Sequence, residues 1–152
     1  MDDLIGLVFG TYPSWSHLVV RVVLGIIFFA HGAQKTFGWF GGHGLSATIG
    51  GFRQMSVPPA ATVIAAFTEC FGGLAMIVGL LARPAALGLV AVMVVAIVKV
   101  HGKHGFFLNF SMAPGKGHGY EYNLALMAMA LSILIGGAGA ISIDRLIVPF
   151  GD

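Results

Sequence analysis

The chain has 152 residues, of which 57% are hydrophobic and 9% are charged, and its mean hydropathy is +0.92. Soluble domains carry roughly a quarter charged residues, so this composition excludes an ordinary soluble globule and predicts a multi-pass membrane protein. The net charge of +2 is spread along an apolar chain, which excludes a nucleic-acid patch. The single cysteine, Cys70, excludes an internal disulfide and a cysteine-rich metal or iron–sulfur site. The length fits one membrane domain, which we expect to occupy residues 1–152.

Four stretches have the composition of a membrane-spanning helix, which needs about 20 mostly apolar residues. They are residues 15–34, 59–81, 84–100 and 120–141. Pro59 and Pro84 suit the first turn of a helix, and the short turn Ala82-Arg83 makes the second and third spans an antiparallel hairpin. Acidic residues at the N-terminus argue against a cleaved signal peptide, so we expect the first span to be retained. The sequence therefore predicts an all-α membrane protein, a four-transmembrane-helix bundle.

Two long connections, residues 36–58 and 101–119, are rich in glycine and in aromatic residues. Because successive spans alternate in direction, both loops are expected on one side of the membrane. Their aromatic rings suit the membrane interface, and we expect a short interfacial helix near residues 45–55. Five basic residues near span ends lie on the loop side and two on the other, namely Lys35, Arg53, Lys99, Lys103 and Lys116 against Arg83 and Arg145. This bias predicts that the loop side is cytoplasmic.

The ionisable side chains of the first span fall on one stripe of the helix. A 4-3-4-3-4 spacing joins His17, Arg21, Leu24, Phe28, His31 and Lys35. Charges in hydrocarbon are costly and usually face a bundle interior or a water-filled cavity. Glu69, near the middle of the second span and among small residues, is expected to face this stripe within reach of Arg21. Two interpretations stay open: a buried Arg21–Glu69 ion pair that fixes helix register, or a Glu69 carboxylate that handles protons or anchors a ligand.

Polar residues also gather where the spans meet the two loops. Each of them alone is explained by the helix dipole or by the snorkelling of a long side chain. Together, beneath glycine-rich loops, they indicate a ligand site at the mouth of the bundle. The candidate catalytic residues are Glu69, His31 and His101, and the candidate ligand-binding residues are Arg21, Gln34, Lys35, His104, Tyr120 and Glu121.

Histidines at the same mouth have a spacing that a metal site could use. His101 and His104 have i, i+3 spacing, and His31 could add a third ligand or, with a histidine of the third span, hold a haem. However, the carboxylate–x–x–His motif of di-iron bundles is absent, and Gly102 weakens a helical placement of the two histidines. We therefore predict neither a bound metal ion nor a haem.

Five short motifs follow one another along the chain in a specific order and spacing. They are R-x-x-L-G from Arg21, H-G-x-Q-K from His31, E-x-x-G-G from Glu69, G-F-F from Gly105 and Y-E-Y from Tyr120. This pattern, over residues 17–145, closely resembles the DoxX family. The resemblance implies a small four-helix protein of the bacterial-type inner membrane, commonly labelled an oxidoreductase and related to a membrane subunit of thiosulfate:quinone oxidoreductase. It implies positions for the polar residues but no defined catalytic constellation.

The residues and the resemblance together favour a membrane subunit of an oxidoreductase system that binds a quinone or a similar aromatic redox ligand. Histidine titrates near neutral pH, so it can both donate hydrogen bonds to quinone carbonyls and deliver protons. The chain shows no nucleotide, flavin or cluster motif, so it needs a redox partner, and whether it is an enzyme by itself stays open.

Two alternatives come from other functional classes. The first is a non-catalytic membrane anchor for a soluble redox partner, which would dock on the two loops. The second, less favoured because no broken helix or inverted repeat is seen, is a carrier of a small molecule or of protons. The expected partners are the lipid bilayer and a redox protein rather than nucleic acid, and small-residue helix faces are compatible with a homo-oligomer.

Overall fold

The computed structural model describes residues 2–148, which form helices joined by turns and loops. The long helices within this range are α2 (Trp15–Thr36), α4 (Pro59–Val78), α5 (Ala82–Ala96) and α6 (Glu121–Gly136). Helix α5 continues through a π-helical turn, Ile97–His101, and a 3₁₀ turn, Gly102–His104. The shorter helices are α1 (Asp2–Phe9), α3 (Gly44–Gln54) and α7 (Ile143–Ile147).

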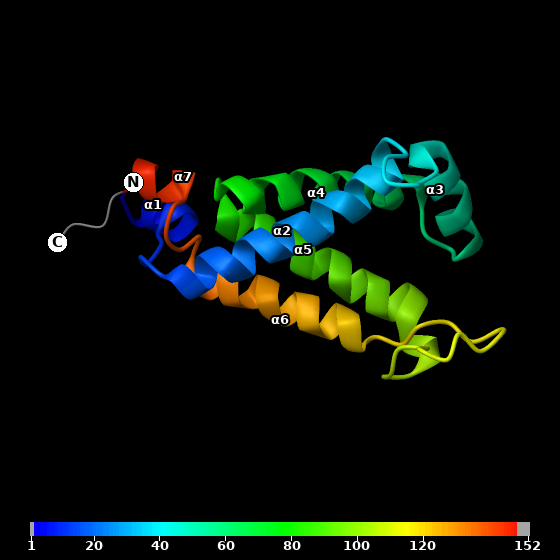
Figure 1. Cartoon of the computed structure of the whole chain (residues 1–152). Helices are drawn as coiled ribbons and strands as arrows, with labels where there is room; N and C mark the ends of the chain where they lie inside the picture. Colours follow the sequence, from blue (N-terminus) through cyan, green and yellow to red (C-terminus); the bar gives the residue numbers. More distant parts are fainter. Residues whose placement is uncertain (1, 149–152) are drawn as a thin grey trace.

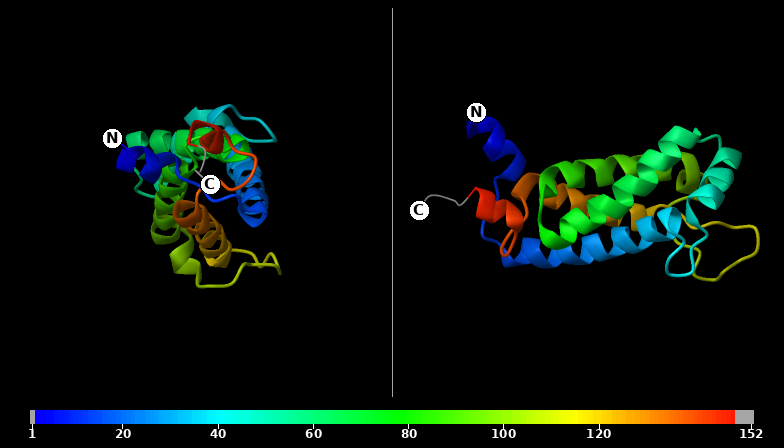
Figure 2. Two further views of the ribbon diagram at one scale, coloured as in Figure 1. Left: turned by 90° about the vertical axis from the view of Figure 1, so that its left-hand side faces the viewer. Right: turned by 90° about the horizontal axis from the view of Figure 1, so that it is seen from above.

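The two ends of the long helices differ. Helices α1 and α7 cover one end, which we call the closed end (Figure 1). Helix α3 and the loop at residues 105–120 lie at the other, which we call the open end, because α5 and α6 diverge there from α2 and α4. The right-hand view of Figure 2 shows the two ends again, with α1 and α7 at one and α3 and the loop at residues 105–120 at the other. Both long connections thus lie at one end, and α3 matches the short helix expected near residues 45–55.

Within the described range, three helical segments have the length and hydropathy to cross a membrane: α2, α4 and the continuous segment Ala82–His104. The all-helical, multi-pass prediction is therefore confirmed. Helix α6 is apolar but has 16 residues, so it is shorter than the fourth span predicted at residues 120–141. Gly137 and Gly139 explain the difference, because both have a φ of +79°, which an α-helix does not accept.

Helices α2 and α4 approach closely because glycines lie in their interface. A Cβ atom at Gly32 would lie 2.2 Å from the backbone nitrogen of Cys70, and one at Gly73 would lie 2.3 Å from that of Phe29. Lipid tails are as apolar as a leucine side chain, so the van der Waals contact between closely packed backbones is a main attraction between membrane helices. The small residues predicted to bring the second span against another helix do so against α2.

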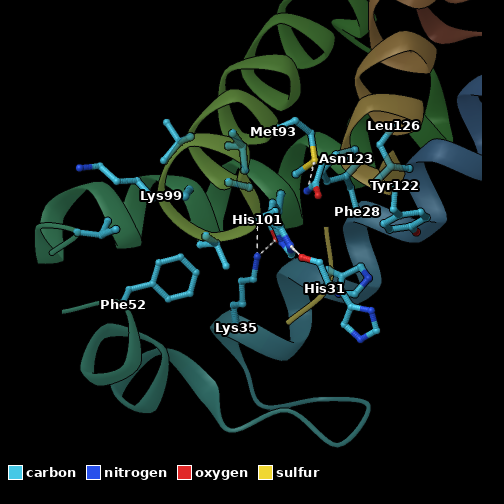
Figure 3. Close-up of a pocket in the computed structure, with 18 of the residues that line it drawn as sticks. Phe28, His31, Lys35, Phe52, Met93, Lys99, His101, Tyr122, Asn123 and Leu126 are labelled. Atoms are coloured by element: carbon cyan, nitrogen blue, oxygen red, sulfur yellow. Dashed lines mark hydrogen bonds and ion pairs between the residues drawn. The ribbon is translucent and has the colours of Figure 1, made fainter. Parts of the chain in front are cut away.

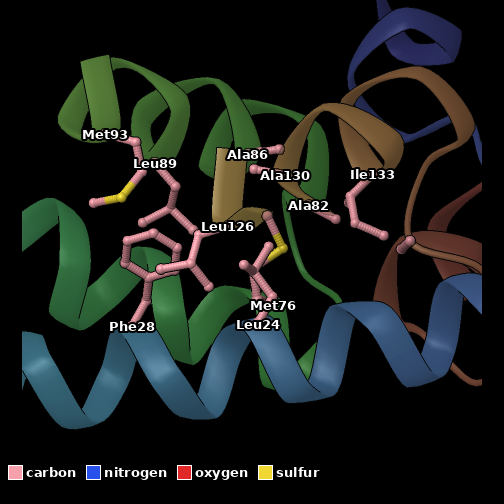
Figure 4. Close-up of a cluster of buried hydrophobic side chains, with 11 residues drawn as sticks. Leu24, Phe28, Met76, Ala82, Ala86, Leu89, Met93, Leu126, Ala130 and Ile133 are labelled. Carbon is pink, nitrogen blue, oxygen red and sulfur yellow. The ribbon is translucent and has the colours of Figure 1, made fainter. Parts of the chain in front are cut away.

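The apolar core fills the closed half of the molecule (Figure 4). All the long helices contribute to it, with Leu24 and Phe28 from α2, Met76 from α4, Leu89 from α5 and Ile133 from α6. Toward the open end the diverging helices leave a cavity instead.

Arg21 is buried at the closed end and holds two chain segments together. Its guanidinium group donates hydrogen bonds only to backbone carbonyls in the part of the chain that the structure describes. These belong to Met76 and Ile77 at the end of α4, with 2.8 Å to Ile77 O, and to Ala138 at 2.9 Å and Ile141 at 3.0 Å. The side chain thus satisfies carbonyls that the end of α4 leaves open and ties the segment after α6 to the bundle.

Of the two interpretations left open for Glu69, the Arg21–Glu69 ion pair is therefore wrong. Cys70, the neighbour of Glu69, packs against Gly32, which lies about 16 Å along α2 from Arg21 at 1.5 Å per residue. Helical side chains also tilt toward the N-terminus of their own helix, so Arg21 extends away from Glu69. The distance exceeds the reach of the side chain that the sequence argument assumed.

Asp144, in α7, lies at the start of α5. Its Oδ1 accepts a hydrogen bond from Leu81 N at 2.7 Å and its Oδ2 accepts one from Ala82 N at 2.9 Å. The free N–H groups at a helix start favour such a carboxylate. Burial raises the pKa of this carboxyl group, while the two N–H donors and the Arg21 guanidinium act in the opposite direction. At the closed end, Asp144 thus links α7 to the start of α5, and Arg21 links α2 to the end of α4 and to the segment after α6.

Candidate functional site

A cavity of about 690 Å³ lies in the open half of the molecule. Its walls come from α2, α4, α5 and α6, from α3 and from the loop at residues 105–120. Apolar side chains form most of its surface, with Phe28, Met93 and Leu126 where it borders the core (Figure 3). Small-molecule sites commonly have this size and a few polar groups in apolar walls. The cavity is lined by the candidate catalytic residues Glu69, His31 and His101 and by the candidate ligand-binding residue Lys35.

The polar centre of the cavity is an ion pair between Lys35 of α2 and Glu69 of α4. The lysine Nζ lies 2.5 Å from a carboxylate oxygen, and the side chain of Glu69 is 4% exposed while that of Lys35 is 29% exposed. Lys35 Nζ also lies 5.9 Å from the ring centroid of Phe52 in α3. A buried carboxylate needs such a partner, because an unpaired charge away from water is costly. Glu69 therefore faces the first span as predicted, but its partner is Lys35.

His101 and His118 are held by backbone contacts that determine which ring nitrogen carries a proton. The Nδ1 atom of His101 lies 2.9 Å from the carbonyl oxygen of His118. A carbonyl only accepts, so His101 Nδ1 is the donor, and in the neutral ring Nε2 is left to accept a proton. His118 Nδ1 accepts from Asn109 N at 3.2 Å, which places the proton of that neutral ring on Nε2. Both residues line the cavity.

The π-helical turn at Ile97–His101 changes which side chains face the cavity. Three consecutive residues, Lys99, Val100 and His101, line it. A regular α-helix separates neighbouring side chains by about 100° and would turn at least one of the three away. Such turns are frequent at functional sites, because they redirect side chains. The exposed Lys99 extends away from Lys35 in Figure 3, so the charged groups at the centre of the cavity are Lys35 and Glu69.

Some residues of the cavity were not among the candidates. They are Phe52, Lys99, His118, Tyr122 and Asn123. Asn123 is 6% exposed, and its Nδ2 donates to the sulfur of Met93 at 3.5 Å. A carboxamide in an apolar span was the available sequence signal, since a polar group placed there needs a partner.

Arg21 and Gln34, two of the candidate ligand-binding residues, do not line the large cavity. Arg21 lies at the closed end. Gln34 donates from Nε2 to the carbonyl of Phe40 at 3.1 Å and lines a smaller hollow of about 290 Å³ beside the start of α3. The side chain therefore shapes the loop between α2 and α3.

His104, Tyr120 and Glu121 also lie outside the cavity lining and organise the loop at residues 105–120. The Glu121 Oε1 accepts from Leu108 N at 2.8 Å. The Tyr120 ring packs edge-on against Phe106, with ring centroids 5.4 Å apart. The His104 ring fills the space that a side chain on Gly117 would need. These residues place the loop over the cavity, so they support the site from outside it.

Comparison with known proteins identifies a family whose model matches this chain. The family model of DoxX matches residues 16–102, which run from the start of α2 to the turn after the π-helical segment. The matched region includes His31, Lys35, Glu69 and His101, whereas α6 and Asn123 lie beyond it. No curated protein and no solved structure matched the chain.

Proposed function

Because this chain belongs to the DoxX family, we propose that it acts as the membrane subunit of an oxidoreductase system and binds a quinone, or a similar aromatic redox ligand, in the cavity at the open end. The observation that carries the proposal is the ion pair of Lys35 with the buried Glu69 carboxylate, set in an apolar cavity large enough for a substituted ring. A structural ion pair needs no such space beside it.

The residues present fit this class of ligand. A quinone head is a flat apolar ring with carbonyl oxygens that only accept hydrogen bonds. Apolar side chains such as Phe28, Val92 and Leu126 suit the ring and the start of a tail, and the ammonium group of Lys35 suits a carbonyl oxygen.

A bound quinone would accept two electrons, supplied by a partner protein with its own redox cofactor, and two protons, one on each oxygen. The Lys35 ammonium group orients one carbonyl and holds a proton beside it. Glu69 balances that charge as a carboxylate, and it can pass to the lysine a proton that it has first taken up from water. His31 is exposed at the rim, so its ring can exchange protons with water, and His101 can carry a proton on Nε2. The chain thus supplies binding, orientation and protons, while the partner supplies electrons.

The placement in the membrane completes the proposal. Helix α6 covers about 24 Å at 1.5 Å per residue, and we infer that it makes a fourth crossing together with the buried segment after Gly136. Irregular backbone is tolerated at membrane depth where protein groups satisfy it, as Arg21 does for Ala138 and Ile141. The basic residues at the open end favour a cytoplasmic location for that end in a bacterial-type inner membrane.

Sidedness is tested by labelling single cysteines in a Cys70→Ala background. Ser46→Cys, exposed in α3, is expected to react only with a reagent that has entered the cytoplasm, and Ser16→Cys, exposed near the closed end, with an impermeant reagent outside. The reverse pattern would overturn the orientation.

Ligand binding is tested on the full chain purified in mild detergent. Mass spectrometry is expected to find a co-purified quinone, and the stripped protein is expected to bind a short-chain ubiquinone in a calorimetric titration. Lys35→Met should weaken this binding about tenfold, the loss of one charge-assisted hydrogen bond. The control is Lys103→Met, an exposed lysine of the 3₁₀ turn outside the cavity. Wild-type protein that binds no quinone would overturn the proposed function.

One feature favours the anchor function as a second candidate. Several apolar side chains of the loop at residues 105–120 are strongly exposed, with Phe107 at 72%, Phe110 at 83% and Met112 at 74%. Such a tip suits the membrane interface or the surface of a partner protein. An intact complex with a redox protein that survives Lys35→Met and is lost with Phe110→Ser would favour the anchor.

A further inference from the structure

We propose that Asn123 is the second polar contact of the ligand, and that its carboxamide binds the oxidised ring through Nδ2 and the reduced ring through Oδ1. This inference rests on the proposed function. It makes the ligand a ring with oxygen atoms on two opposite edges, as in a 1,4-quinone, one held from the Lys35–Glu69 side and the other from α6.

The position of Asn123 is unlike that of a surface amide. It lies in the first turn of α6, is 6% exposed and lines the cavity beside Met93 and Leu126. Figure 3 shows it with Met93 on one side of the pocket and Lys35 on the other. The two polar groups therefore come from the two halves of the molecule that diverge at the open end.

The hydrogen bond of this side chain is weak for so buried a group. Within residues 2–148 the only side-chain hydrogen bond seen for Asn123 is the 3.5 Å contact from Nδ2 to the Met93 sulfur. A carboxamide offers two N–H donors and a carbonyl acceptor, and a thioether sulfur is a weak acceptor. Burying a polar group without good partners is costly, and such groups are almost always satisfied in folded proteins. A ligand oxygen in the cavity is a stronger acceptor for Nδ2 than the Met93 sulfur.

The chemistry of a carboxamide suits both redox states. A quinone oxygen only accepts, so Nδ2 donates to it. A quinol oxygen carries a hydrogen, which Oδ1 accepts after the amide rotates about its terminal torsion. A lysine ammonium group has no acceptor and cannot make the second contact. Asn123 is thus a binding residue that can hydrogen-bond to both the quinone and the quinol, while Lys35 favours the quinone.

The test is a calorimetric titration of the full-length protein in detergent with a short-chain ubiquinone, oxidised and then reduced with dithionite. Asn123→Leu keeps the size of the side chain and removes its polar atoms. We expect it to weaken binding of both forms about tenfold, and Lys35→Met to weaken the oxidised form more than the reduced one. Lys103→Met, an exposed lysine outside the cavity, is the control and should leave both affinities within about twofold.

The outcomes separate the inference from the function on which it rests. Wild type that binds neither form overturns the proposed function. Wild type that binds both, with Asn123→Leu unchanged, overturns the inference alone. A second measurement uses only the wild type, so it does not depend on whether a variant folds. Infrared spectra of bound ubiquinone, labelled with ¹³C at C1 or at C4, should show that both carbonyl bands move to lower frequency on binding. A shift of one carbonyl only would contradict a contact at each edge.

Discussion

Helix α2 carries one cation at the closed end of the molecule and one at the open end, and the two differ in their exposure and in their hydrogen-bond partners. At the closed end, Arg21 is 1% exposed and donates to backbone carbonyls of α4 and of the segment after α6. At the open end, Lys35 is 29% exposed, pairs with the Glu69 carboxylate and borders a cavity of about 690 Å³. The fold satisfies the first cation on all sides and leaves space beside the second.

The difference shows how one polar stripe serves two purposes. The Arg21 guanidinium group is buried and donates four of its five N–H groups to fixed carbonyls, so its role is to hold the chain together. An ammonium group with one carboxylate partner and open space can turn part of its hydrogen-bonding capacity to a bound molecule. Four variants test this comparison, taken from the largest expected effect to the smallest.

Arg21→Met should lower the free energy of unfolding by about 3–5 kcal/mol, because buried carbonyls at the end of α4 and after α6 lose their donor. The measurement is thermal or SDS-induced unfolding in detergent. Arg145→Met, at an exposed arginine of α7, is the control and should change little. If Arg21→Met is as stable as the control, the closed end is not held as described.

Gly32→Ala should cost about 2–3 kcal/mol, because its Cβ would meet the backbone of α4 at Cys70 and force the helices apart. Quinone affinity should fall with it, since the same shift separates Lys35 from Glu69. Gly50→Ala in α3 is the matched control, because no atom lies within 4 Å of the added Cβ. Equal stability of the two variants would show that the α2–α4 interface tolerates a wider spacing.

Lys35→Met should cost about 1–3 kcal/mol by leaving the Glu69 carboxylate buried and unpaired, and Glu69→Gln in the same chain should recover most of the loss. Asp144→Asn should not rescue Arg21→Met in the same way, because the partners of Arg21 are carbonyls. Unfolding of the single and double variants measures both cycles. Rescue at the closed end without rescue at the open end would reverse the comparison.

Asp144→Ala should cost about 1 kcal/mol, the usual loss of a side-chain acceptor at a helix start, and should leave quinone affinity unchanged. Unfolding and titration of the same preparation give both values. A loss of affinity as large as that of Lys35→Met would mean that the two ends are coupled through α5.

Much of the fold was readable from the sequence. The apolar runs predicted the positions of α2, α4 and α5, and Pro59 marked the start of α4. The turn predicted at Ala82-Arg83 lies instead at residues 79–81, because Gly79 ends α4 with a φ of +70° and Ala82 already begins α5. The third apolar segment ran on to His104, and the fourth ended at Gly136, because a window of apolar residues does not reveal a π-helical turn or a positive φ. Boundaries of this kind depend on backbone conformation more than on composition.

The candidate site was predicted in part. Four of the predicted residues, His31, Lys35, Glu69 and His101, line one cavity. The carboxylate of Glu121, by contrast, accepts a hydrogen bond from Leu108 N and lies outside the cavity. The sequence could not show this contact, because it depends on the path of the loop. Asn123 was missed, because its importance comes from burial and from a poor partner, and neither can be seen in a residue name.

The sequence by itself determined that the chain is helical and membrane-spanning and that the ionisable residues of α2 share one face, because these follow from composition and from the period of the helix. The tertiary structure decided which charges meet. Glycine contacts fix the position of α4 along α2. In that position Glu69 pairs with Lys35, and the carbonyls at the end of α4 accept hydrogen bonds from Arg21. A pairing between helices depends on their relative register, which depends on packing between distant residues.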